Sequence, residues 1–169
     1  MTQRLLEVDS CGALLRRARM EDMPDAAKIH RLAFFTAMPH MPVLHTPEED
    51  LNFYTTGVFI SSEVWVAEFD DVLAGVIAFR DGLLQHLYVI PKCQRQGIGS
   101  SLLSVAKSMS DSLRVWTFQC NEGARNFYEK HGFRVVQRSN GARNEERQPD
   151  MMYVWEREPS GESRPPARA

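Results

Sequence analysis

Hydrophobic and polar positions alternate with two different periods along this chain, and the first of these periods is helical. Over residues 23–37, small and apolar side chains recur every three or four positions, which predicts an amphipathic helix with Asp22 as its N-cap. A short strand is expected before it, over residues 13–19. A proline-rich loop, residues 38–47, leads to a second helix that extends to about Ile60.

The second period, that of β-strands, begins after residue 62, where β-branched and aromatic residues dominate. Segments 63–69 and 72–79, separated by two aspartates, predict an antiparallel hairpin, and 82–90 adds a third long strand. The remaining elements are expected, in chain order, as helix 97–109, strand 113–119, helix 122–131, strand 133–138 and strand 150–157. This order predicts an α+β (mixed α/β) fold, with a central sheet and helices on its faces.

Composition narrows the class of protein. The chain has 169 residues, 43% hydrophobic and 25% charged, as expected for one soluble domain over residues 1–157. The Pro-, Ser- and Arg-rich tail, residues 158–169, is expected to be disordered. A net charge of −2 gives no field that would hold nucleic acid or an anionic membrane, so neither is expected as a partner.

The same sequence argues for a cytoplasmic protein without a metal. Charged or polar residues interrupt the apolar runs before they could span a bilayer, and the N-terminus lacks the features of a signal peptide. Three cysteines without CxxC spacing favour reduced thiols over a disulfide framework. The five histidines are scattered and show no zinc-like spacing.

The stretch QRQGIGSSLL, residues 94–103, is typical of an anion site. Glycines at the start of a helix leave unpaired amides that point at a ligand, and the helix dipole favours negative charge there. The spacing fits neither a nucleotide P-loop, which needs GK[ST], nor the three-glycine dinucleotide fingerprint. The alternative is a glycine turn that only precedes a packed helix.

A second motif, NEGARNFYEKHGF at residues 121–133, favours the anion site. Together with LYVIPKCQRQGIGSSLL, residues 87–103, it resembles the two cofactor motifs of the GNAT superfamily of N-acetyltransferases. The resemblance covers roughly residues 13–157. It implies a GNAT-like central sheet of about seven strands, mixed but mostly antiparallel, flanked by about four helices.

The resemblance also implies a binding site for acetyl-CoA as co-substrate. The pantetheine arm would enter a split between two strands, and the pyrophosphate would rest on backbone amides. The implied cofactor-binding residues are Leu87, Tyr88, Val89, Gln94, Arg95, Gln96, Gly97, Ile98, Gly99, Ser100, Ser101, Asn121, Ala124, Phe127 and Tyr128.

Three residues are candidates for catalysis. The Tyr128 hydroxyl is expected to face the sulfur, and full proton transfer from a phenol to a thiolate is uphill by about 2 kcal/mol. Tyr128 is therefore expected to stabilise the thiolate by a hydrogen bond, or to act as a true acid if its pKa is lowered. The alternative is that Tyr128 is only a packed aromatic side chain. The chain lacks the acid or histidine that many GNAT enzymes carry at the positions of Leu83 or Gln85, so Gln85 is expected to order a water. Glu146 is an acidic alternative.

His86 is another candidate for the group that takes the proton of the amine, beside the water that Gln85 would order. Simple alternation would put His86 on one face with Leu84 and Tyr88, and a helix is expected to cover that face. A packed histidine is the more ordinary interpretation of His86 and also of His30, which lies on the apolar stripe of the first helix.

The acceptor is expected to be a primary amine of a small molecule, bound near loop 38–47. Phe35, His45 and Tyr54 are candidates for its lining. Two alternatives remain open, namely acetylation of a peptide or protein amine, and an acetyl-CoA-binding sensor without turnover. A homodimer is compatible with the sequence, which does not determine it.

Overall fold

The computed structural model describes residues 12–159, and it confirms the expected fold class. Seven strands form one sheet in the order β1-β2-β3-β4-β5-β7-β6, and every neighbouring pair except β4 and β5 is antiparallel. The strands are β1 (Leu14–Arg17), β2 (Glu63–Phe69), β3 (Val72–Arg80), β4 (Leu83–Val89), β5 (Ser112–Phe118), β6 (Arg134–Ser139) and β7 (Asp150–Glu156). Cys11 and residues 160–169 of the predicted tail lie outside the described residues.

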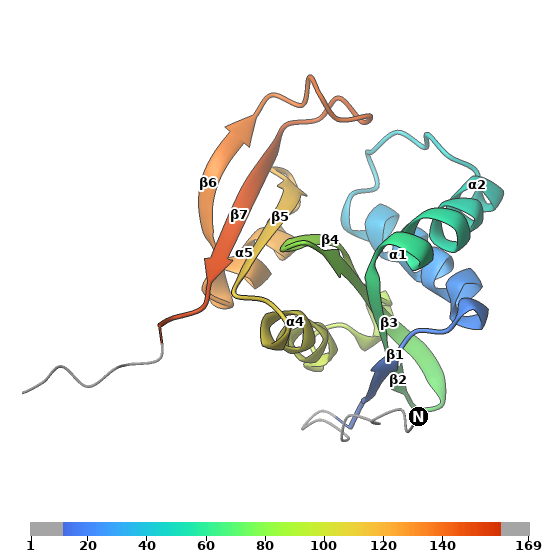
Figure 1. Cartoon of the computed structure of the whole chain (residues 1–169). Helices are drawn as coiled ribbons and strands as arrows, with labels where there is room; N and C mark the ends of the chain where they lie inside the picture. The colour runs from blue at the N-terminus through green and yellow to red at the C-terminus, as the bar shows by residue number, and fades with distance from the viewer. Residues whose placement is uncertain (1–11, 160–169) are drawn as a thin grey trace, which may run out of the picture.

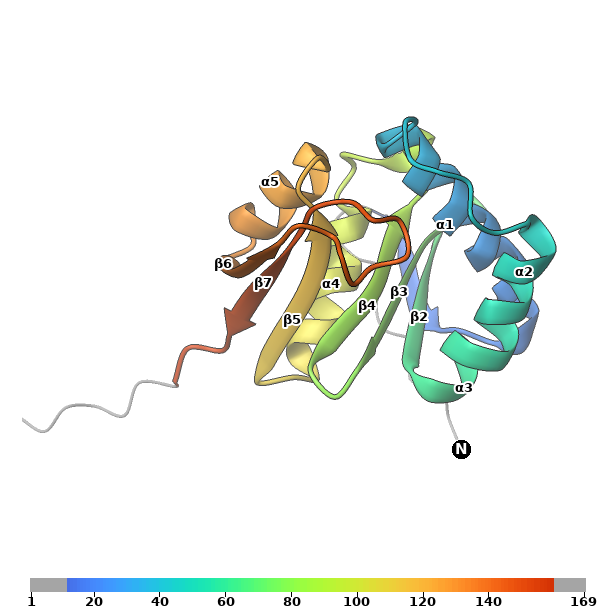
Figure 2. The same cartoon turned by 90° about the horizontal axis from the view of Figure 1, so that it is seen from above.

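Helices cover both faces of this sheet (Figures 1 and 2). One face carries α1 (Met23–Ala37) and a continuous helical segment made of α2 (Pro47–Asn52), the π-helical turns η2 (Phe53–Val58) and α3 (Phe59–Ser61). The other face carries α4 (Ile98–Ser108), and α5 (Glu122–Lys130) lies beside β5 and the β6–β7 hairpin. None of the helices within residues 12–159 combines the length and apolar character needed to cross a membrane.

The start of α1 differs in detail from the expectation. Asp22 stands at the N-cap position, but its carboxylate makes no capping bond to the helix. It accepts hydrogen bonds from Arg16 at 2.7 and 2.8 Å and from the backbone N–H of Arg19 at 2.6 Å. An ion pair with the neighbouring strand therefore replaces the predicted cap, because a guanidinium forms a stronger, bidentate bond with a carboxylate than a single amide does.

The parallel pair β4 and β5 opens into a split. Leu83 and Arg114 form the single register pair between them, and the backbone N–H of Arg114 donates to the Gly82 carbonyl at 2.7 Å. Beyond this point the two strands diverge, as Figures 1 and 2 show. The sheet therefore has a gap in its ladder where β4 leads into the glycine turn.

A bulge in β4 changes which side chains share a face. Ala78 on β3 pairs with His86, but the next residue of β3 pairs with Leu84, so Gln85 is an extra residue. An extra residue shifts the alternation by one position. His86 and Tyr88 thus face α1, whereas Leu84 lies on the opposite face with Leu87. The predicted grouping of Leu84 with His86 and Tyr88 is wrong for this reason.

Candidate functional site

The edge of β4 that faces the split presents unpaired backbone groups. The Ile90 N–H donates to the Ala74 carbonyl on β3 at 2.8 Å. Residues that bond the partner strand alternate in an antiparallel ladder, so Tyr88 also faces β3. The N–H and C=O groups of Leu87 and the N–H of Val89 consequently point into the split, where an extended ligand could pair with them as an added strand.

The turn that follows β4 is shaped as an anion cradle. Gly97 is the N-cap of α4 with a φ of 91°, a left-handed conformation that side chains with a Cβ rarely adopt. Gln94 anchors the turn because its Nε2 donates to the Val89 carbonyl at 3.0 Å. Residues 94–97 are exposed, and the first amides of α4 have no partner within their helix. The predicted residues 94–101 thus form one continuous loop and helix start.

Helix α5 packs against this cradle through two rings. The Phe127 ring lies against Gly99, where an added Cβ would stand 3.4 Å from it. The His131 ring lies 4.3 Å from the Phe127 ring, centroid to centroid, and its Nε2 is 2.9 Å from Ser100 Oγ. The two motifs recognised in the sequence are therefore in direct contact.

The opposite wall of the split begins at Asn121. Its side-chain carbonyl caps α5 by accepting from the Ala124 N–H at 3.1 Å, which leaves the Asn121 Nδ2 without a partner among residues 12–159. Tyr128 follows two turns later and is buried, with 6% of its surface exposed. Its hydroxyl has no hydrogen-bond partner within the same residues. Burial, and then the neighbouring Tyr88, raise the pKa of Tyr128.

The raised pKa of Tyr128 bears on whether it could act as an acid or only as a hydrogen-bond donor. A phenol with a raised pKa keeps its proton at neutral pH, so transfer to a thiolate is further uphill than the value for an ordinary tyrosine. Such a hydroxyl can still donate a hydrogen bond to a developing negative charge. Tyr128 is thus suited to stabilising a thiolate rather than to acting as a full acid.

The candidates for the base lie beside one another on β4. Gln85 is tied to the end of the helical segment, because Ser62 Oγ donates to its Oε1 at 2.6 Å. His86 is enclosed between α1 and η2; burial lowers its pKa to about 3, and its Nδ1 has no hydrogen-bond partner. Burial also lowers the pKa of His30 to about 4. Both imidazoles are therefore neutral and weakly basic at pH 7, which favours Gln85 and a water over either histidine.

The two loops beyond the split meet through one contact. His45, in the proline loop, and Glu145, in the loop between β6 and β7, lie 3.0 Å apart. The hydrogen bond to Glu145 raises the pKa of His45. The next residue, Glu146, is close enough to Tyr88 to contribute, after burial, to the raised pKa of that phenol. Glu146 thus lies within electrostatic range of Tyr88 on β4.

The structure changes the expected lining of the acceptor side. Tyr54 is fully buried, so its predicted contact with an acceptor is wrong. Sequence reasoning missed Trp116, which lies on β5 and is 41% exposed. Phe118 meets Phe34 of α1, and alternation along β5 puts Trp116 on the same face, beside the split. No pattern in the sequence marked Trp116, because both faces of β5 carry large residues.

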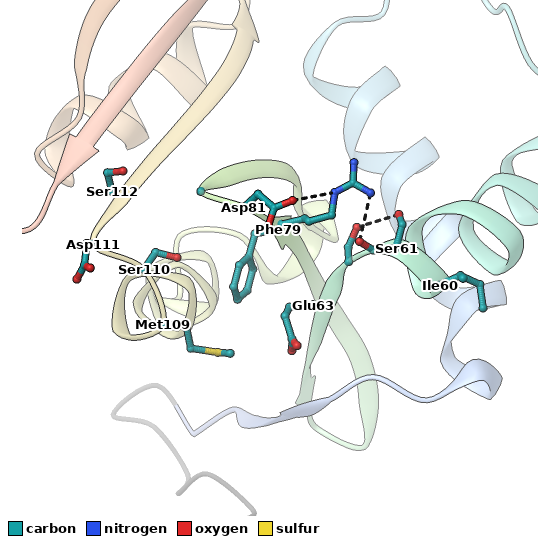
Figure 3. Close-up of a pocket in the computed structure, with 12 residues that line it drawn as sticks. Ile60, Ser61, Glu63, Phe79, Asp81, Met109, Ser110, Asp111 and Ser112 are labelled. Carbon is teal, nitrogen blue, oxygen red and sulfur yellow. Dashed lines mark hydrogen bonds and ion pairs between the residues drawn. The ribbon is translucent and has the colours of Figure 1, made fainter.

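A separate recess of about 640 Å³ lies at the narrow end of the split. Ser61, Asp81 and Asp111 are among the residues around it (Figure 3). None of the predicted site residues lines it, so it is not part of the arrangement described above. Within residues 12–159, no three His, Cys, Asp or Glu side chains are grouped so that they could hold a metal ion.

Comparison with known proteins gives matches in sequence and in fold. Residues 61–135 match the family described as an acetyltransferase (GNAT) domain. The chain is 34% identical over 77 residues to the peptidyl-lysine N-acetyltransferase YiaC of Escherichia coli strain K12; the match spans 45% of this chain and 53% of YiaC, so it covers about half of that relative.

Two solved structures extend the likeness to most of the chain. The apo form of YjaB from Escherichia coli superposes with a TM-score of 0.71 at 22% identity, covering 84% of this chain and 96% of YjaB. The PaiA N-acetyltransferase of Thermoplasma acidophilum, in complex with coenzyme A, superposes with a TM-score of 0.69 at 18% identity, covering 85% and 98%. The matched segment 61–135 contains the β4 edge, the cradle and α5. Residues 61–135 are therefore similar to GNAT acetyltransferase domains, and most of the chain shares the fold of these two solved structures.

Proposed function

We propose that this protein transfers an acetyl group from acetyl-CoA to the primary amine of a small molecule. The observation that carries the proposal is the split itself. Unpaired backbone groups of Leu87 and the Val89 N–H border the split, the Gly97 turn follows them, and Tyr128 lies near enough to Tyr88 for that residue to raise its pKa. The CoA complex of PaiA, which shares the fold, supports the choice of co-substrate.

The residues present fit this co-substrate. The amides at the start of α4 and the Gly97 turn would hold the pyrophosphate, and the Leu87 and Val89 backbone would pair with the pantetheine amides. The unpartnered Nδ2 of Asn121 is available to bind a carbonyl of the same arm. These contacts would fix the thioester beside Tyr128, so that an amine held on the α1 face attacks it from a fixed position; orientation of this kind can supply roughly 7–11 kcal/mol.

The proton balance of the reaction assigns the remaining roles. The acceptor must lose a proton before it attacks, and a lysine-like amine needs about 4.6 kcal/mol to become neutral at pH 7. Gln85, held by Ser62, would order the water that takes this proton, and Glu146 would attract the ammonium group. When the carbon–sulfur bond breaks, the Tyr128 hydroxyl would donate a hydrogen bond to the departing thiolate. The nitrogen would lose its second proton through the same water, and the thiolate would take up one proton from solvent.

The first experiment measures thiol release from acetyl-CoA with a panel of amines, amino acids, aminoglycosides and peptides. Tyr128→Phe is expected to lower the amine-dependent rate at least tenfold while calorimetry shows unchanged binding of acetyl-CoA. Tyr153→Phe is the matched control, because the Tyr153 hydroxyl bonds Glu129 at 2.7 Å and not the split. Binding without release on any amine would instead favour the sensor, and an absence of binding would contradict the assignment of the cradle.

A peptide or protein lysine is the second candidate acceptor. The similarity to YiaC, a peptidyl-lysine N-acetyltransferase, favours it. The contact between His45 and Glu145 favours the small molecule, because it joins the two loops that border the acceptor side. Activity on lysine peptides that exceeds activity on every free amine in the panel would reverse our choice.

A further inference from the structure

His131 connects α5 to the anion cradle through two hydrogen bonds of its ring. Its Nδ1 lies 2.7 Å from the Phe127 carbonyl oxygen, and its Nε2 lies 2.9 Å from Ser100 Oγ. Ser100 is the third residue of α4, in the turn whose amides are unpaired. The C-cap residue of α5 therefore holds a hydroxyl within the cradle.

The two bonds determine where the hydrogens are. A carbonyl oxygen only accepts, so Nδ1 carries a hydrogen and donates it to Phe127. In a neutral imidazole the other nitrogen is then an acceptor, so Nε2 takes its hydrogen bond from Ser100. While His131 is neutral, the Ser100 hydroxyl hydrogen is committed to the ring, and its oxygen presents only lone pairs to an anion.

We propose that Ser100 and His131 form a proton-linked positioning pair for the pyrophosphate of the co-substrate. When His131 takes up a proton, both ring nitrogens donate, and Ser100 Oγ becomes the acceptor of the Nε2 bond. The hydroxyl hydrogen is then released and turns toward the phosphate, which gains a donor backed by a positive charge. The inference rests on the proposed binding of acetyl-CoA, and it predicts that binding is coupled to proton uptake.

The surroundings contain few charges that could alter this coupling. From α4, Lys107 donates to the main-chain oxygen of His131 at 2.6 Å, while its ammonium group lies over the rings of Phe133 and Trp155. Along α5, Glu129 accepts from Tyr153, and Lys130 is exposed. Of these groups, Lys107 is the charged residue that contacts His131 directly.

The test uses dephospho-CoA as the probe. It keeps the pyrophosphate but lacks the 3′-phosphate, a monoester whose second ionisation near pH 6 would otherwise change the charge of the ligand. Calorimetry compares pH 5.5 with pH 8, a range in which His30 and His86, with pKa values of about 4 and 3, stay neutral. A second measurement at pH 6.5, in two buffers of different ionisation enthalpy, counts the protons taken up on binding.

Three variants separate positioning from folding. His131→Gln keeps a hydrogen-bonding group but does not titrate, and Ser100→Ala removes the hydroxyl. Ser104→Ala is the matched control, because Ser104 is exposed one turn further along α4 and bonds only the Ser100 carbonyl. Thermal melting establishes that each variant is folded, and either variant alone tests the pair.

The wild type and Ser104→Ala are expected to bind dephospho-CoA about threefold to tenfold more tightly at pH 5.5 than at pH 8, with proton uptake. His131→Gln and Ser100→Ala are expected to lose both the affinity ratio and the uptake. Equal ratios and equal uptake in all four proteins would overturn the inference while leaving the proposed function intact. No binding to the wild type would instead contradict the proposed function.

Discussion

Tyr88 of β4 stacks on His30 of α1, with the ring centroids 4.1 Å apart and 11° between the ring planes. The stack joins the α1 layer to the strand that borders the split. It also encloses His30 among the rings of Phe34, Tyr54 and His86, and this burial lowers the pKa of His30 to about 4. The buried cluster therefore makes the stability of the protein depend on pH.

The sign of that dependence follows from the direction of the shift. The folded state binds the proton of His30 less readily than the unfolded state, whose histidine titrates near 6.5. The stability is fully present above about pH 6.5 and is lost as the pH falls toward about 4. We measure the free energy of unfolding in urea at pH 7 and at pH 5. Between these pH values it is expected to fall by about 2 kcal/mol less in His30→Phe than in the wild type. Equal losses in the two proteins would contradict this account.

Replacing Gly97 by alanine tests the cradle. A residue with a Cβ at a φ of 91° costs roughly 1–2 kcal/mol, so the turn should shift or lose stability. We expect binding of acetyl-CoA to weaken at least tenfold by calorimetry. Gly57→Ala in η2 is the control, since an added Cβ there meets Phe53 at an ordinary 3.6 Å. Unchanged affinity in Gly97→Ala would show that the turn does not hold the co-substrate.

Trp116→Ala tests the acceptor face of β5. An exposed indole beside the split offers a large contact surface for a bound acceptor. The expected result of steady-state kinetics is a KM for the amine raised about fivefold to tenfold, roughly 1 kcal/mol of binding, with the KM for acetyl-CoA changed less than twofold. Val136→Ala on β6, similarly exposed at 43%, should leave both constants unchanged. A rise confined to the KM for acetyl-CoA would instead place Trp116 at the acetyl-CoA site.

The His45–Glu145 contact predicts a titration that NMR can follow. Because the hydrogen bond to Glu145 raises the pKa of His45, the ion pair is present at low pH and is lost as the pH rises through that pKa. Glu145→Gln should move the pKa of His45 back toward the ordinary value. Glu48→Gln, in the same acidic region but outside the contact, should not. An unshifted His45 in Glu145→Gln would mean that the loops do not meet in solution.

Local patterns accounted for the elements and for the cofactor motifs. The period of apolar residues predicted α1 and α4, and the glycines at 97 and 99 predicted the cradle, because both signals depend on neighbours within a few positions. The covering of His86 and Tyr88 by a helix was predicted correctly, but the face of Leu84 was not. The bulge at Gln85 arises from the pairing of β4 with β3, and no residue type in the segment LLQHLYV predicts a bulge there.

The sequence by itself determined the order of elements, the mixed fold class and the family motifs, because each depends on the spacing of residues only a few positions apart. Only the tertiary structure decided that Trp116 is exposed and Tyr54 buried, and that burial raises the pKa of Tyr128. It also decided that His131 reaches Ser100 across 31 positions of the chain. Exposure, pKa and long-range contacts depend on which layers pack together, and that packing is a property of the whole molecule.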